Sequence, residues 1–169
     1  MDGFQLRDKM GVQHFVCKEL GISFLYKEQC SRFTFRVGEY YQLLPSCKAV
    51  VRWTMRNIHG LRFEDKAGDL PQEALPAVLK ELCTIGVNES GRNVIAYKGG
   101  HFESDLLQAA GIQCYNLEEL GCPKYRELLK MFDVLSAPSC GLHCYAYDHI
   151  AVHCPVAETM LFRKWLIGV

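Results

Sequence analysis

The sequence lacks a long uninterrupted apolar run, an excess of charge of either sign, and any internal repeat or low-complexity segment. No window approaches the roughly eighteen consecutive apolar residues of a membrane-spanning helix, so we expect no membrane partner. The opening residues, MDGFQLRDKMG, carry charges where a secretory signal peptide needs an apolar centre. We therefore expect an intracellular protein of the cytoplasm or nucleus.

The composition is that of an ordinary globular protein. Of the 169 residues, 49% are hydrophobic and 22% are charged. This balance excludes disorder as the main state, because disordered chains combine low hydrophobicity with high net charge. The length suits one compact domain and no linker interrupts it, so we expect residues 1–169 to form a single domain.

Positive and negative charges are equal in number but unevenly distributed. Lys and Arg number 19, as do Asp and Glu, so bulk charge does not favour binding to a polyanion. Residues 1–66, however, contain 11 Lys and Arg against 7 Asp and Glu. A local basic face in this part of the chain stays open as a nucleic-acid contact.

Nine cysteines in a chain without a secretory signal are expected to be reduced, since disulfides are rare inside cells. Six of them stand singly among apolar neighbours and are expected to be small buried side chains: Cys17, Cys30, Cys47, Cys83, Cys114 and Cys122. The other three, Cys140, Cys144 and Cys154, alternate with histidines and are therefore examined as metal ligands.

The hydrophobic pattern predicts strands first and then alternating helices and strands. Alternation and β-branched or aromatic residues indicate strands at residues 14–26, 32–37, 93–97 and 113–117. Helical spacing of apolar residues indicates helices at residues 46–58, 72–82, 101–110, 123–132 and 159–167. This order favours an α/β sandwich with one mixed sheet whose first strands are antiparallel.

The predicted helix at residues 46–58 has signals at both ends and an apolar face. Ser46 is a candidate N-cap, and Gly60 suits the left-handed position that closes a helix. The face expected to pack inward consists of Cys47, Val50, Val51, Thr54 and Ile58.

A basic stripe occupies the opposite face of that helix, where Lys48, Arg52 and Arg56 recur every four residues. The stripe is either an ordinary solvated face or a set of phosphate contacts, with Trp53 nearby as a candidate stacking group. Lys98, which precedes two glycines at the start of a predicted helix, belongs either to a phosphate site or to a plain turn.

The strongest local signal is the pattern Cys140-x2-His143-x10-Cys154. Thiolate and imidazole are preferred zinc ligands, and a two-residue gap lets Cys140 and His143 reach one tetrahedral ion from a single turn. A structural zinc site usually has four protein ligands, and three residues are candidates for the fourth: Glu19, His59 and His149. The alternative is that all these residues serve packing or face solvent without metal.

His59 has several roles open to it, because it lies at the start of the loop after the basic helix. It is a fourth metal ligand in place of Glu19, a hydrogen-bonding support for a ligand, or a helix C-terminal cap favoured by the helix dipole. The residues alone do not choose among the three.

The middle and end of the chain resemble the DEDD-type 3′–5′ exonucleases of the ribonuclease H-like superfamily. Residues 59–107 contain a His-Gly-Leu turn, a helix, a strand and Phe102-Glu103, which stands where these enzymes have Phe-Asp. His153-x4-Glu158 stands where they have His-x4-Asp. The resemblance implies a ribonuclease H-like α/β fold, and for a nuclease it implies these catalytic residues: Asp2, Glu103, His153 and Glu158.

The chain departs from the exonuclease pattern where the chemistry is most demanding. Two-metal catalysis needs closely spaced carboxylates and a His that activates water. Both matched aspartates are replaced by Glu, and the Asp-x-Glu pair of the first strand is reduced to Asp2. We therefore expect that this strand is cut short or lost, and that two-metal exonuclease activity is absent.

The zinc pattern and the exonuclease-like order occur together in the Maelstrom domain of the piRNA pathway, which this sequence resembles. The matching segments are Lys18-Glu19-Leu20-Gly21, Tyr97-Lys98, Asn116-Leu117-Glu118, and Cys140-x2-His143 with Cys154. A related group of animal proteins, some from mobile elements, is similar across nearly the whole chain. The resemblance implies a Glu-Cys-His-Cys zinc site formed by Glu19, Cys140, His143 and Cys154.

These features together favour a zinc-stabilised, exonuclease-derived domain that binds single-stranded nucleic acid, with RNA expected. The candidate contacts are Lys48, Arg52, Arg56 and Lys98. Two alternatives stay open. One is an active nuclease, either a degenerate metal-dependent exonuclease or a metal-independent RNA endonuclease. The other is a protein-interaction scaffold in a small-RNA or transposon context, whose affinity for RNA should not respond to neutralising the basic stripe.

Overall fold

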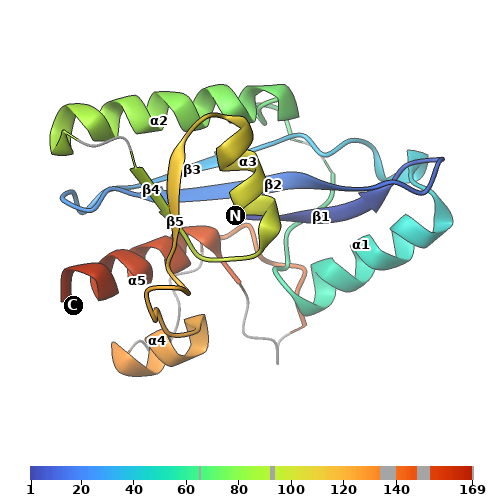
Figure 1. Ribbon diagram of the computed structural model, residues 1–169. Coiled ribbons are helices and arrows are strands. Elements are labelled where there is room, and N and C mark those ends of the chain that lie inside the picture. The colour runs from blue at the N-terminus through green and yellow to red at the C-terminus, as the bar shows by residue number, and fades with distance from the viewer. Residues whose placement is uncertain (65, 92–93, 134–139, 148–152, 169) are drawn as a thin grey trace.

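The chain is a mixed α/β structure in which helices cover small sheets (Figure 1). A computed structural model describes residues 1–64, 66–91, 94–133, 140–147 and 153–168. His149, one of the candidate metal ligands, lies outside these described residues.

The described strands form two separate sheets instead of the single mixed sheet that we predicted. Strands β1 (Asp2–Arg7), β2 (Gln13–Ser23) and β3 (Cys30–Thr34) are antiparallel and lie in the order β1-β2-β3. Strands β4 (Val94–Tyr97) and β5 (Gln113–Asn116) form a parallel pair. No ladder of hydrogen bonds joins β4 to the first sheet within the part of the chain that the structure describes.

Strand β1 corrects our expectation that the first strand is cut short or lost. It spans six residues and pairs with β2 along its whole length. Phe4 and Leu6 are buried, whereas Gln5 and Arg7 are exposed, so this strand has the two-residue period of a half-buried strand.

A β-bulge interrupts the pairing of β1 with β2. Gly3 lies opposite Cys17, but the next residue, Asp2, lies opposite Glu19, so Lys18 is the extra residue on β2. A bulge changes which face the following side chains point to. Cys17 packs in the apolar core with Leu20, whereas Glu19 points to the other face, toward the segment that carries Cys140 and His143.

The helices lie on both faces of the sheets (Figure 1). They are α1 (Pro45–Asn57), α2 (Leu75–Ser90), α3 (His101–Ala109), α4 (Tyr125–Met131) and α5 (Pro155–Gly168), with short 3-10 turns at Tyr40–Gln42 and Gln72–Ala74. Helices α2 and α3 cover one face around a core that includes Leu79 and Leu107, and α1 and α5 lie below the opposite face. None of the described helices is both long and apolar enough to cross a membrane.

The first turn of α5 packs directly on β2. A Cβ atom at Gly21 would lie 2.5 Å from the Pro155 backbone, so only glycine allows this approach. The approach positions Cys154, which directly precedes α5, beside the strand that carries Glu19.

Helix α1 begins differently from our expectation. Ser46 is not its N-cap: the helix starts at Pro45, the cap position is Leu44, and no side chain bonds to the cap. Proline is favourable in the first turn because its fixed φ suits the helix and its missing N–H would have no partner there. Cys47 and Val51 are buried as predicted, but Val50 is 45% exposed and Ile58 is 37% exposed, so the inward face is narrower than the pattern indicated.

The other helices are close to their predicted places, with shifted ends. Helix α2 continues eight residues past its predicted end at residue 82, and α5 begins four residues before its predicted start at residue 159. Helix α4 begins at Tyr125, two residues later than predicted, because Glu127 accepts a hydrogen bond of 2.7 Å from the Lys124 backbone and caps the helix there.

Candidate metal centre

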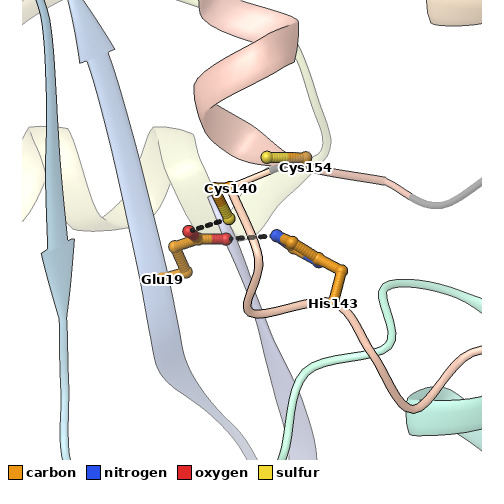
Figure 2. Close-up of side chains that lie close together, drawn as sticks. All are labelled: Glu19, Cys140, His143 and Cys154. Atoms are coloured by element: carbon orange, nitrogen blue, oxygen red, sulfur yellow. Dashed lines mark hydrogen bonds and ion pairs between the residues drawn. The ribbon is translucent and has the colours of Figure 1, made fainter. Parts of the chain in front are cut away.

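Four potential metal ligands converge from three separate parts of the chain (Figure 2). Glu19 comes from the middle of β2, Cys140 and His143 come from residues 140–147, and Cys154 directly precedes α5. One ligand atom from each residue lies within 4.8 Å of all the others. We call residues 140–147 the metal-site segment.

The donor atoms of this cluster are buried and point at one another. Glu19 is 0% exposed and Cys154 is 3% exposed. The Cys140 Sγ lies 3.3 Å from Glu19 Oε1, and His143 Nε2 lies 2.9 Å from Glu19 Oε2. Among the described residues, however, neither Glu19 Oε2 nor His143 Nε2 makes a hydrogen bond of acceptable geometry, so the two buried polar atoms face each other without a hydrogen bond. Such atoms are costly unless something else, such as a cation, satisfies them.

The orientation of His143 is set by a backbone carbonyl. Its Nδ1 donates a short hydrogen bond to the carbonyl oxygen of His59. In a neutral imidazole this leaves Nε2 as the nitrogen with a free lone pair, and Nε2 is the atom that faces Glu19. Metal-binding histidines are commonly held in this way, with the second ring nitrogen bonded to a carbonyl or carboxylate.

The charges of the cluster are strongly coupled. Burial opposes the imidazolium, but the adjacent Cys154 and Glu19 outweigh it and raise the pKa of His143 to about 11. Burial likewise opposes the thiolate of Cys154, yet the neighbouring His143 lowers the pKa of Cys154 below its ordinary value. Burial raises the pKa of the Cys140 thiol. A positive charge within the cluster thus favours the anionic form of Cys154, as a bound cation would.

His59 supports the cluster without belonging to it. Leu61 N donates to its Nδ1 at 3.0 Å, and its Nε2 lies 3.0 Å from the carbonyl oxygen of Gly3. Both ring nitrogens are therefore occupied, so the alternative of His59 as a ligand in place of Glu19 does not agree with the structure. Burial lowers the pKa of His59 to about 4, and the ring is neutral at physiological pH. Its contribution to the site is its backbone carbonyl, which holds His143.

The metal-site segment is bound to the C-terminal end of α1. Tyr147 N donates to Arg56 O at 3.0 Å, and Tyr145 N donates to Gly60 O at 3.0 Å. Gly60 has φ of +66°, and a Cβ atom there would lie 2.6 Å from His143 O. Any other residue at this position would be strained and would push the metal-site segment away.

The donor set fits a metal ion. Two cysteine sulfurs, one imidazole nitrogen and one carboxylate oxygen gather around a common point, and two of these atoms have no other partner. Four such ligands are typical of a closed structural site, and thiolates favour a soft ion. The residues present can therefore hold a metal ion with protein ligands alone.

The residues of the nuclease alternative lie in the described structure but do not form a comparable cluster. His153 Nδ1 lies 2.8 Å from Glu158 Oε1, and Asp2 is buried with its Oδ2 unpartnered. Burial raises the pKa of Asp2 to about 7, although the nearby Met1 ammonium acts in the opposite direction. Among the described residues, the cluster with Glu19 is the only group whose ligand atoms all lie within 4.8 Å, so Asp2, Glu103, His153 and Glu158 are not brought together as metal ligands.

The basic stripe is on the surface, and each of its members contacts a tyrosine. Arg52 and Arg56 are exposed, and Lys48 is partly buried. Lys48 and Arg52 contact Tyr40, the guanidinium of Arg56 lies over the Tyr147 ring at 5.6 Å, and Trp53 is 58% exposed. None of these tyrosine contacts was predicted from the sequence, because nothing in the residue pattern relates Tyr40 or Tyr147 to α1.

Lys98 does not join the basic stripe. It follows β4, far from α1 (Figure 1). Its Nζ is bound by Glu118 Oε1 at 3.1 Å and by Cys122 O at 3.1 Å. The structure therefore favours a role for Lys98 in holding the β4–β5 region together over a role in a phosphate site.

Comparison with models of known protein families, with curated proteins and with solved structures gives no match.

Proposed function

We propose that this chain is a zinc-stabilised domain with a ribonuclease H-like fold that binds single-stranded RNA and lacks two-metal exonuclease activity. The observation that carries the proposal is the connection between its two parts: the metal-site segment is hydrogen-bonded to the end of the helix that presents the basic stripe. A metal at the cluster would thus hold the binding face in place.

The chemistry of the donor set supports zinc. With Cys140, Cys154 and Glu19 deprotonated and His143 neutral, the buried cluster would carry a charge of −3, which is strongly unfavourable without a cation. A divalent ion with a preference for sulfur and nitrogen ligands neutralises most of this charge, and zinc is the ion that tetrahedral Cys-His sites usually hold. Direct metal analysis of the purified protein should find one zinc per chain.

The surface of α1 supports nucleic-acid binding. Cations at four-residue spacing contact phosphates, and an exposed indole such as that of Trp53 stacks on bases regardless of sequence. Among the described residues, the carboxylates that an exonuclease would use do not form a group with the geometry of metal ligands, which supports binding without hydrolysis. The resemblance to the Maelstrom domain points in the same direction and favours RNA over DNA.

A salt titration tests the proposal. Three phosphate contacts on a single strand predict a log–log slope of affinity against salt of about −2. The variant Lys48→Gln/Arg52→Gln/Arg56→Gln should lose most of this slope and most of the affinity. The matched control is Lys80→Gln/Arg126→Gln/Lys130→Gln, which removes the same charge from exposed positions on α2 and α4. If the two variants behave alike, the stripe is an ordinary solvated face, and the scaffold alternative replaces RNA binding.

A nuclease assay tests the other half of the proposal. Incubation with single-stranded RNA or DNA and either magnesium or manganese should give no processive 3′–5′ degradation. Degradation that disappears in Glu103→Gln and Glu158→Gln would show instead that the chain is an active exonuclease, and degradation without added metal would favour the endonuclease alternative.

A further inference from the structure

A cavity of about 570 Å³ lies between the two sheets. Its side walls are residues Leu20–Ser23 of β2 and Val94–Tyr97 of β4, and side chains of α2, α3 and α5 close it from the two faces. Apolar residues such as Leu82 and Phe162 form most of the lining. This volume is in the range of pockets that bind ligands.

Within the part of the chain that the structure describes, both side walls are strand edges without a neighbouring strand. The pairing of β2 with β1 stops at Glu19, so residues 20–23 pair with β3 alone. Strand β4 pairs with β5 on one side, and its other edge faces the cavity. Backbone N–H and C=O groups at such edges are templates for another strand.

The end of the cavity next to β1 is acidic. Glu103 and Glu158 line it, and Asp2 lies nearby, where its charge and theirs act on the Met1 ammonium. Glu158 is paired with His153, but Glu103 makes no hydrogen bond or ion pair with any described residue. Glu103 is therefore the carboxylate at this end of the cavity that a further positive charge can pair with.

We propose that the cavity binds an extended apolar peptide of a partner protein, which adds a strand between β2 and β4 and directs a basic side chain toward Glu103 and Glu158. Only a polypeptide backbone offers alternating donors and acceptors to two strand edges at once. Helices cover both faces of the gap, so the added strand must be apolar on both sides, as buried strands are. The added strand would lie beside residues 20–23 of β2, in line with β1. The inference does not depend on RNA binding.

The probe is a synthetic peptide, Lys-Val-Ile-Val-Thr-Val-Lys, and its control is Lys-Val-Pro-Val-Pro-Val-Lys, which lacks two of the backbone N–H groups. Hydrogen exchange is followed at the amides of residues 20–23 and 94–97. At saturation the first peptide should slow exchange at both edges by at least about tenfold, and the control should not. Protection of one edge only, of neither edge, or by both peptides equally would overturn the proposal.

Two variants test whether the peptide binds in the cavity. Gly86 lies on α2 in the lining, and a Cβ atom there meets nothing within 4 Å, so Gly86→Phe should fill the cavity, abolish protection and leave the melting temperature unchanged or higher. Glu103→Gln should weaken binding of the lysine-ended peptide several-fold without altering the fold. Unchanged protection in Gly86→Phe would place the peptide elsewhere and refute the site.

Discussion

Two neighbouring residues of β2, Lys18 and Glu19, are both buried and both charged, yet their surroundings differ completely. Lys18 Nζ donates to Asp69 Oδ2 at 2.8 Å and to the carbonyl oxygens of Phe35 and Glu64 at 3.2 and 3.3 Å. Asp69 accepts further bonds from Thr34 Oγ1 and from the Lys66 backbone. This network is complete in itself, because protein groups satisfy the charge on both sides.

The cluster around Glu19 is incomplete in the same sense. Its oxygen Oε2 and the facing nitrogen of His143 have no hydrogen-bond partner although both are buried. A buried ion pair that is fully hydrogen-bonded contributes to structure alone, whereas unpartnered donors that converge on one point indicate a ligand. Burial and charge are similar in the two clusters. A binding cluster differs from a structural one in that some of its buried polar atoms have no hydrogen-bond partner.

Removing the metal should cause the largest loss of stability, because it leaves the negative charge of the Glu19 cluster without a counter-ion. The Lys18 network should be unaffected. A ligand present at about a thousand times its Kd stabilises a fold by about 4 kcal/mol. For a chain of this size that corresponds to about 8–16 °C in melting temperature. Differential scanning calorimetry with and without a strong zinc chelator measures the shift, and Cys140→Ser should reproduce it. Zinc-free protein with unchanged melting would refute the metal site.

Breaking the Lys18 network should rank second. Asp69→Asn leaves the Lys18 ammonium buried without its counter-ion. Losing one partner of a buried pair costs about 3 kcal/mol at the lower end, and the carbonyls of Phe35 and Glu64, which still accept from Lys18, keep the loss near that value. Urea unfolding of the zinc-loaded protein measures the loss. The number of zinc ions per chain should stay the same, since neither Lys18 nor Asp69 contributes a ligand to the Glu19 cluster. A variant that also lost zinc would show that the two clusters are coupled.

A smaller loss of stability is expected from Gly60→Ala, which acts on the metal cluster through the backbone of His143. Its positive φ and its close approach to His143 O should cost about 1–3 kcal/mol. The variant should also release zinc at a lower chelator concentration, because the metal-site segment is displaced. Competition with a fluorescent zinc indicator measures this release. Gly68→Ala, also at positive φ but with open space around it, is the matched control and should retain zinc normally.

Cys144→Ser should have the smallest effect, within about 0.5 kcal/mol. Cys144 lies beside His143 in the chain, but its side chain is exposed and outside the cluster. It is therefore the matched control for Cys140→Ser in both calorimetry and metal analysis. A large loss of zinc in this variant would mean that the ligand set is wrong.

The parts of the fold that were predictable from sequence are those set by local periodicity. Apolar spacing identified α1 to α5 because each helix buries a stripe of its own residues. The division into two sheets was not predictable in this way, because strand pairing depends on contacts between distant residues. Strand β1 was not predicted, although Phe4 and Leu6 have the two-residue period of a half-buried strand.

Some residues of the metal centre were predictable from the sequence alone, and others were not. Cys140, His143 and Cys154 were found from their spacing, because ligands close in sequence leave a recognisable pattern. Glu19 was chosen from its resemblance to a known site, and no local rule would select it: strict alternation along β2 would place it on the same face as Cys17. The role of the His59 carbonyl could not be predicted, because every residue has a backbone oxygen and the sequence does not show which one bonds to His143.

The bulge at Lys18 separates the two charged clusters of β2 in their response to a change in length. Deleting Lys18 would let β1 and β2 pair without interruption, and the strand as such would survive. Cys17 and Glu19 would then be adjacent and alternate regularly, so Glu19 would keep the face opposite Cys17 and stay with Cys140, His143 and Cys154. We therefore expect a single-codon deletion at Lys18 to abolish the Lys18–Asp69 pair and to retain the metal site.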